Sequence, residues 1–413
     1  MKSSVVAGPL AASGLTGRST SLLLAGASFK SSSLGFRESL AQRLSRDPST
    51  LLALPGVKEL AQLVTCNRIE VFLASESPAA TEQAVLVWMS AVPGYARSAV
   101  YLHRDFEAVL HLFSVAAGLD SMVVGEDQIL SQVREAGIAA RTSSTSRGSL
   151  SALFDASVNV GKRSRRLLQE PTESVSSVSI RHALALLPSP PKNVLLIGTG
   201  KTSRLAASLV KGAKLFVATR RKTLPFPGAK VVSHRDLKRV ASRCELIVSA
   251  TRHQGYVLRR GDITDKRRVI VDLAFPRNID PGLKSESTVL LNLEDLAKVV
   301  PKKPLGVDAR AAEEWVAAEA ESFSRWLLAS RQSDVLSQVY RWAETTREEE
   351  AKAALRRLPR LTVKERKVVE TMSRRLVSKL LAPPTSFAKA STPEFPQQQR
   401  LDIMRLVFEQ GEG

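Results

Sequence analysis

One segment decides the fold of the central part of the chain: Leu195-Leu-Ile-Gly198-Thr199-Gly200-Lys201-Thr202-Ser203. Its apolar half predicts a buried strand, and the residues after it predict a helix. Gly198 permits a tight turn, and Gly200 lets backbone N–H groups approach a pyrophosphate at the N-terminus of that helix. Ser203 replaces the third glycine of the usual fingerprint and is still small enough for close helix–strand packing. The segment therefore predicts a dinucleotide-binding turn.

The segment opens a series of strands that alternate with helices, after the proline-rich linker 188–191. This alternation predicts a parallel sheet covered by helices on both faces, as in a Rossmann-like domain. The expected strands are 193–198, 214–219, 246–250, 269–273 and 288–292, with a helix over 202–211 after the first of them.

The end of the second strand indicates which nicotinamide cofactor is used. An enzyme specific for NAD usually has an acidic residue there, which binds the ribose 2′-hydroxyl. This chain has no acid between Lys211 and Lys222, and instead carries Arg220 and Arg221. A guanidinium binds a 2′-phosphate in a bidentate manner, so we expect NADPH as the cofactor. The alternative is a solvated basic turn with no ligand.

The regions on either side of this domain differ from it. Residues 21–165 mix short strands (21–25, 62–64, 71–74) with helical patterns (83–91, 106–117, 129–141), which predicts an α+β domain. From Asp308 strand signals are lacking, and apolar residues from Val316 to Trp342 predict a helix of about 30 residues. Such a helix is expected to pack on a partner chain, with a monomeric bundle as the alternative. Pro383 and Pro384 are expected to end the helical region.

Charge and composition restrict the function further. The 413 residues include 60 Lys and Arg against 40 Asp and Glu, a net charge of +20, which favours a polyanionic partner. The apolar runs are too short to cross a bilayer. The two cysteines cannot form a disulfide framework, and their surroundings lack the spacing of zinc ligands, so we expect no metal. Residues 1–20 look like a disordered leader, and a cytoplasmic location is preferred over a plastid one.

Cys66 is the candidate nucleophile. It follows an apolar strand within Thr65-Cys66-Asn67-Arg68, and Arg68 is expected to lower the thiol pKa and to hold a carboxylate of the substrate. On local chemistry alone, an inert buried thiol is an equally good interpretation. Cys244 precedes an apolar run and fits the inert interpretation much better.

Several blocks together resemble the glutamyl-tRNA reductase family, in order and spacing, over residues 20–390. They are Thr65–Arg68, Gly118–Gln132, Gly198–Ser203, Val271–Asp280, Glu321–Trp326 and Leu380–Pro384.

The resemblance implies a homodimer with three domains in each chain. The expected division is a leader (1–20), a catalytic glutamyl-tRNA-binding domain (21–165), an NADPH-binding Rossmann domain (166–306), a helical dimerisation domain (307–390) and a tail (391–413). It also implies a reaction: Cys66 attacks the α-carbonyl of glutamyl-tRNA, and NADPH reduces the thioester to glutamate-1-semialdehyde. The next enzyme, glutamate-1-semialdehyde aminomutase, is a further partner that the resemblance suggests.

The resemblance also assigns site residues. His111 falls on the family's activity-critical histidine, and Gly198 to Ser203 would hold the NADPH pyrophosphate. The implied substrate pocket is Thr65, Asn67, Arg68, Ser121, Glu126, Asp127, Gln128 and Gln132.

The chain departs from the family pattern at three positions. Phe29 stands where the family has a histidine, Asp127 replaces a proline, and Lys201 replaces a common acidic residue. Since Cys66 and its neighbours are kept, we expect an active but divergent enzyme. Two alternatives stay open: a catalytically silent relative that binds tRNA, and an ordinary NADP-dependent dehydrogenase of a small metabolite.

Overall fold

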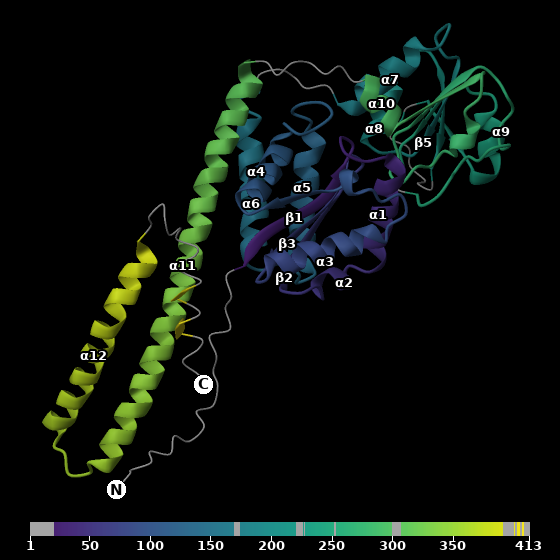
Figure 1. The fold of residues 1–413 in the computed structure, drawn as a ribbon. Helices are drawn as coiled ribbons and strands as arrows, with labels where there is room; N and C mark the ends of the chain where they lie inside the picture. Colours follow the sequence, from purple (N-terminus) through teal and green to yellow (C-terminus); the bar gives the residue numbers. More distant parts are fainter. Residues whose placement is uncertain are drawn as a thin grey trace. The chain divides into compact units, whose positions relative to one another are not determined.

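The computed structural model describes residues 20–168, 174–219, 226, 228–251, 253–299 and 307–390, together with 400, 403, 404, 407 and 408 (Figure 1). The expected leader, most of the tail, and both Arg220 and Arg221 lie outside these residues. The chain forms two compact units, 21–321 and 322–413 with 1–20. In the described part of the chain, every helix is too short or too polar to cross a membrane.

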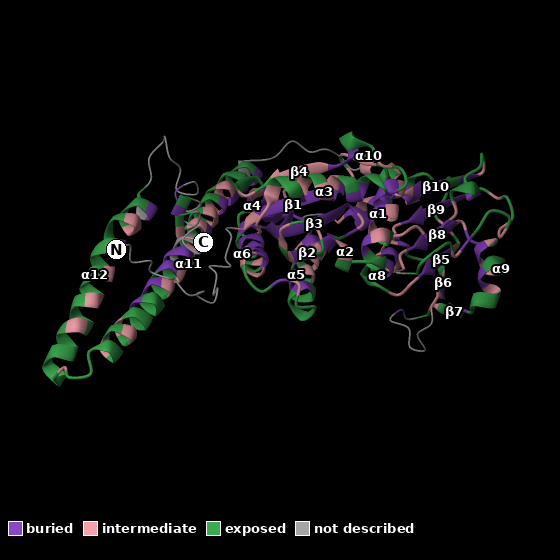
Figure 2. Ribbon diagram, turned by 60° about the horizontal axis from the view of Figure 1, so that its bottom comes forward, coloured by how far each residue is buried: buried purple, intermediate pink, exposed green. Residues whose placement is uncertain are grey.

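The first unit begins with an antiparallel sheet of four strands in the order β2-β3-β1-β4. Helices pack on both of its faces, so β3 is buried along its whole length (Figure 2). One face packs on α1 and α3, and on the other Phe72 contacts Phe154 of α6 edge to face, with ring centroids 5.2 Å apart. The strands are β1 (Ser21–Ser28), β2 (Val57–Val64), β3 (Arg68–Ser75) and β4 (Tyr101–Arg104). The helices are α1 (Leu34–Arg46), α2 (Ser49–Leu52), α3 (Pro78–Ser90), α4 (Phe106–Ala117), α5 (Asp127–Thr142) and α6 (Ser149–Ser164).

A parallel sheet of six strands follows, in the order β10-β9-β8-β5-β6-β7. The predicted Rossmann-like α/β architecture is thus confirmed. β5 lies between β8 and β6, which is the switch point at whose carboxyl edge such folds bind ligands. The strands are β5 (Asn193–Ile197), β6 (Lys214–Ala218), β7 (Lys230–Val232), β8 (Leu246–Ser249), β9 (Arg268–Asp272) and β10 (Thr288–Asn292). The helices are α7 (Val175–Ala185), α8 (Lys201–Leu209), α9 (Leu237–Ala241) and α10 (Leu293–Val299).

Two helices complete the chain: α11 (Val307–Arg357), which has 51 residues, and α12 (Val363–Lys389). The expected length of α11 was too short. The prediction that Pro383 and Pro384 end the helical region was wrong, because both lie inside α12. Each proline removes one backbone hydrogen bond. The helix continues because Leu381 and Ala388, on either side of the prolines, are buried in one apolar cluster with α11.

Candidate active site

A tight turn between β2 and β3 presents the candidate nucleophile. The Thr65 hydroxyl accepts hydrogen bonds from the backbone N–H groups of Asn67 (3.2 Å) and Arg68 (3.0 Å), and the Thr65 N–H donates to the Arg68 carbonyl (2.9 Å). These bonds fix the backbone on both sides of Cys66, which is half-buried and has no disulfide partner. Thr65 therefore shapes the turn, which leaves Cys66 half-buried.

The environment of Cys66 disfavours the thiolate. Burial, and then the charge of Glu126, raises the pKa of the Cys66 thiol to about 12, and the opposing effects of Arg37 and Arg68 do not offset them. The expectation that Arg68 lowers the pKa of this thiol is confirmed in direction, but burial and Glu126 outweigh that effect. Cys244 is fully buried in an apolar cluster, in agreement with the inert role predicted for it.

Arg68 has its charge neutralised by carboxylates of its own chain. Its Nη1 donates to Glu70 Oε1 at 2.9 Å and to Asp120 Oδ2 at 3.0 Å, and its Nη2 donates to the Asp120 carbonyl. Lys30 makes a second ion pair with Asp120. A substrate carboxylate would therefore have to compete with Asp120 for Arg68.

Glu70 connects Arg68 to His111. Its Oε1 lies 2.7 Å from His111 Nε2 and accepts a hydrogen bond from the Tyr101 hydroxyl at 2.5 Å. Burial alone would raise the pKa of Glu70, but His111, Arg68 and Tyr101 outweigh it and bring the pKa to about 2. Glu70 is thus ionised at neutral pH, so His111 Nε2 carries the proton and donates. The His111 ring also stacks on His103, with centroids 5.2 Å apart.

A glycine makes room for this cluster. Gly26 of β1 pairs with Glu70 on one side and with Tyr101 on the other. A Cβ at Gly26 would lie 2.7 Å from Glu70 Cγ and 3.1 Å from the Tyr101 ring, so a larger residue would displace both side chains. An isolated glycine within a strand signals such a close approach. Sequence reasoning did not assign Glu70, Tyr101, Lys30 or Asp120, and Gly26 was the signal that could have led to the first two.

The remaining predicted pocket residues lie on the loop 118–126 and on α5. Gly118 and Gly125 close this loop through a backbone hydrogen bond of 3.0 Å. Glu126 is buried and acts electrostatically on Cys66. Gln128 and Gln132 are half-buried on α5, and Ser121 is half-buried in the loop. No hydrogen bond of the described residues joins these last three to the Cys66 turn or to His111; the Asp127 side chain is not described.

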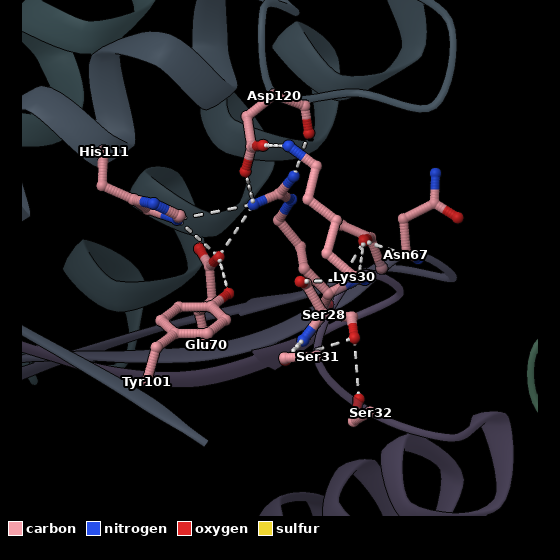
Figure 3. Close-up of polar contacts among 11 residues, drawn as sticks. Ser28, Lys30, Ser31, Ser32, Asn67, Glu70, Tyr101, His111 and Asp120 are labelled. Atoms are coloured by element: carbon pink, nitrogen blue, oxygen red, sulfur yellow. Dashed lines mark hydrogen bonds and ion pairs between the residues drawn. The ribbon is translucent and has the colours of Figure 1, made fainter. Parts of the chain in front are cut away.

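The segment at the position of the missing family histidine lies against the same turn. The Phe29 N–H donates to the Asn67 carbonyl at 2.8 Å. Asn67 Oδ1 is buried and accepts no hydrogen bond from any described residue, and Figure 3 shows this side chain pointing away from His111. An unused buried acceptor beside Cys66 is suited to a donor group of a ligand.

The glycine turn has the geometry that a dinucleotide requires. Gly198 has φ +111°, and a Cβ there would lie 2.7 Å from the Ala250 carbonyl oxygen. Gly200 caps α8, and a Cβ built on it would contact nothing within 4 Å. Ser203 is fully buried. Open space at Gly200, over a helix N-terminus at the switch point of the sheet, fits the pyrophosphate of a nicotinamide dinucleotide.

An ion pair joins the two sheets of the first unit. The Arg277 Nε and Nη2 atoms donate to both oxygens of Glu38 on α1, at 2.6–3.0 Å, and the Arg277 backbone N–H also donates to Glu38. Arg277 follows β9, whose last residue, Asp272, accepts from the backbone N–H groups of Asn278 and Ile279. The segment after β9 therefore anchors the domain of the parallel sheet to α1.

Comparisons with known families agree with this architecture. Residues 25–167 match the glutamyl-tRNA(Glu) reductase N-terminal domain, and residues 311–410 match the glutamyl-tRNA(Glu) reductase dimerisation domain. Residues 185–299 match the shikimate/quinate 5-dehydrogenase family, which covers the parallel sheet.

Individual relatives extend over most of the chain. A glutamyl-tRNA reductase of Rubrobacter xylanophilus is 31% identical, with 89% of this chain and 92% of the relative aligned. A protein named glutamyl-tRNA reductase 2, of Anaeromyxobacter dehalogenans, is 33% identical, with 89% and 87% aligned. Among solved structures, the glutamyl-tRNA reductase of Methanopyrus kandleri matches with a TM-score of 0.52 at 25% identity, covering 95% of this chain and 98% of that chain.

Proposed function

Because the chain belongs to the glutamyl-tRNA reductase family, we propose that it reduces glutamyl-tRNA to glutamate-1-semialdehyde with NADPH and releases the tRNA, the first step of tetrapyrrole synthesis from glutamate. The observation that carries this proposal is the free, half-buried thiol of Cys66. It stands on a rigid turn, beside the Arg68–Glu70–His111 cluster and in the same compact unit as the glycine turn.

The first half of the reaction is an acyl transfer to sulfur. Cys66 Sγ attacks the α-carbonyl carbon of the aminoacyl ester, a C–S bond forms, and the bond to the ribose oxygen breaks. The thiol proton ends on that ribose oxygen, so the tRNA leaves as an alcohol. Since an aminoacyl ester is already activated, a thiolate suffices as the nucleophile.

Glu126 makes the ionisation of the Cys66 thiol depend on substrate binding. In the free protein, burial and the Glu126 charge keep the Cys66 thiol protonated at neutral pH. The glutamyl residue carries an α-ammonium group, which placed against Glu126 would cancel part of that charge. Substrate binding would therefore lower the thiol pKa at the moment when a thiolate is needed.

The second half is reduction of the thioester. NADPH bound over Gly200 would supply the hydride. Gly198 to Ser203 would hold its pyrophosphate, while Arg220 and Arg221, which lie outside the described residues, remain the predicted ligands of the 2′-phosphate. His111, fixed by Glu70, would orient or polarise the ester group, and Arg68 would hold the substrate γ-carboxylate in place of Asp120.

We also propose a homodimer, through the domain that includes α11 and α12, and a cytoplasmic location. The long helix and the match to a dimerisation domain support the dimer. Binding of glutamate-1-semialdehyde aminomutase stays a prediction.

The decisive test traps the acyl-enzyme. Purified protein is mixed with glutamyl-tRNA labelled in the amino acid, without NADPH, and quenched in acid. We expect label on wild-type protein and on the Cys244→Ser control, none on Cys66→Ser, and semialdehyde once NADPH is added. Unlabelled wild-type protein that still binds tRNA would instead identify a silent relative, and turnover of free glutamate would identify an ordinary dehydrogenase.

A further inference from the structure

A buried arginine beside the catalytic turn has unused hydrogen-bond donors. Arg37 lies in the first turns of α1, and its side chain is fully buried. Its Nη1 donates to the carbonyl of Ser32 at 2.6 Å and, at the limit of hydrogen bonding, to that of Ser28 at 3.5 Å. Nε and Nη2 are buried and have no hydrogen-bond partner among the described residues.

This arrangement is costly for the folded protein. A buried guanidinium normally has a carboxylate bound to it, because removal of a charge from water costs several kcal/mol. Glu38 and Glu294 act on Arg37 through their charge, yet neither is hydrogen-bonded to it, and Glu38 binds Arg277 instead. Two directed donors held free at this cost indicate that a ligand uses them.

The position of Arg37 shows where that ligand lies. Ser28, which accepts from Arg37, pairs with Arg68 at the end of β1, and the next residue, Phe29, bonds to the Asn67 carbonyl. The guanidinium is therefore next to the turn that presents Cys66, and it interacts electrostatically with the thiol. It also interacts electrostatically with Glu294, in the first turn of α10, which follows the parallel sheet. Arg37 thus lies within electrostatic range of both the thiol and the first turn of α10.

We propose that Arg37 Nε and Nη2 bind the carbonyl oxygen of the acyl group on Cys66, an assignment that rests on the proposed function. When Sγ attacks the ester, this oxygen becomes negative until the C–O bond to the ribose breaks. When hydride adds to the thioester carbon, the same oxygen becomes negative again until the C–S bond breaks, which releases the aldehyde and returns the thiolate. Arg37 stabilises the charge in both steps and is a catalytic residue in both.

Arg68 is less suited to this task. Both of its terminal nitrogens are engaged by Glu70 and Asp120, and only its Nε lacks a partner. Arg37 offers two donors in the planar arrangement that binds an oxygen strongly. Such donors, in place before the reaction, contribute most where charge develops.

The test compares steps that form an oxyanion with one that does not. Arg37→Met replaces a buried charge with an apolar side chain of similar length, and Arg46→Met, at an exposed position on the same helix, is the matched control. Three rates are measured: thioester formation with glutamyl-tRNA, reduction of the preformed thioester by NADPH, and alkylation of Cys66 by iodoacetamide. We expect Arg37→Met to slow the first two by about 100-fold or more. Alkylation should change far less.

Equal losses in all three rates would overturn the proposal, since Arg37 would then act only on the thiolate. Thioester formation and reduction close to the wild-type rates would overturn it as well. If Arg37→Met does not fold, Arg37→Lys keeps a cation but loses the second directed donor, and is expected to slow the same two steps selectively. A wild-type protein that forms no thioester would refute the proposed function itself, which separates the two failures.

Discussion

Replacing Glu70 by Gln tests the charge cluster quantitatively. The pKa of Glu70 is about 2, against an ordinary value of 4.5, because His111, Arg68 and Tyr101 together outweigh burial. At about 1.4 kcal/mol for each pH unit, this difference corresponds to about 3 kcal/mol of folding free energy. A carboxyl whose folded-state pKa is lowered stabilises the protein above its unfolded-state pKa. This contribution is therefore fully present at neutral pH and is lost as the pH falls from about 4.5 to about 2.

Hydrogen exchange of peptides from β3 is the appropriate assay, because it reports local opening without requiring the whole chain to unfold in one step. At pH 7 we expect Glu70→Gln to lower the free energy of opening by about 3 kcal/mol. The difference in the free energy of opening between wild type and Glu70→Gln should become smaller as the pH is lowered from 5 toward 3. Glu107→Gln is the control, since this exposed carboxylate lies 3.6 Å from His103 and should contribute less than about 1 kcal/mol.

Two results would refute this reasoning. If Glu70→Gln lowers the free energy of opening no more than Glu107→Gln does, the cluster does not stabilise the ionised form of Glu70. If the difference in the free energy of opening between wild type and Glu70→Gln stays constant or grows on acidification, the lost stability comes from packing and not from charge.

Three further changes give distinct results. Gly200→Ala should leave the thermal stability unchanged, since φ at this position is −75° and the new Cβ contacts nothing. It should weaken NADPH binding by about 1–3 kcal/mol in a fluorescence titration, because the Cβ would occupy space proposed for the pyrophosphate. An unchanged affinity would contradict the proposed pyrophosphate site. Gly198→Ala should destabilise the fold by about 1–3 kcal/mol in urea, because φ is +111° and the Cβ meets the Ala250 oxygen; wild-type stability would contradict this. Burial raises the pKa of Asp272 to about 6, so its protonated form favours the folded state, and stability should fall as the pH rises from about 4 to about 6. Asp272→Asn should remove that part of the pH dependence of exchange in β9, and an unaltered pH profile would count against it.

Much of the architecture could be predicted because it depends on local pattern. The helix expected over 106–117 and the strand expected over 288–292 have the observed bounds, since Gly118 ends the helix and the polar segment 284–287 precedes the strand. The persistence of α12 through its two prolines could not be predicted. Local chemistry favours a break there, and tertiary packing against α11 overrides it.

The site was predictable only in part, for a related reason. Cys66 and its neighbours form one short block, so sequence alone singles them out. Glu70 joins His111 and Tyr101 through strand register, and Asp120 reaches Arg68 from a loop 52 residues away in the chain. Arg37 could not be predicted either, because its unused donors depend on which groups the folded chain places around its guanidinium.

Gly26 restricts how the sequence of the candidate active site can vary. Because residue 26 of β1 has no side chain, its two neighbouring strands β3 and β4 can interact directly across it: the Glu70 carboxylate of β3 accepts a hydrogen bond from the Tyr101 hydroxyl of β4. Even an alanine at position 26 would displace the Glu70 side chain, and His111 would lose its hydrogen bond to that carboxylate. We therefore expect position 26 to accept no residue other than glycine as long as Glu70 binds both Tyr101 and His111.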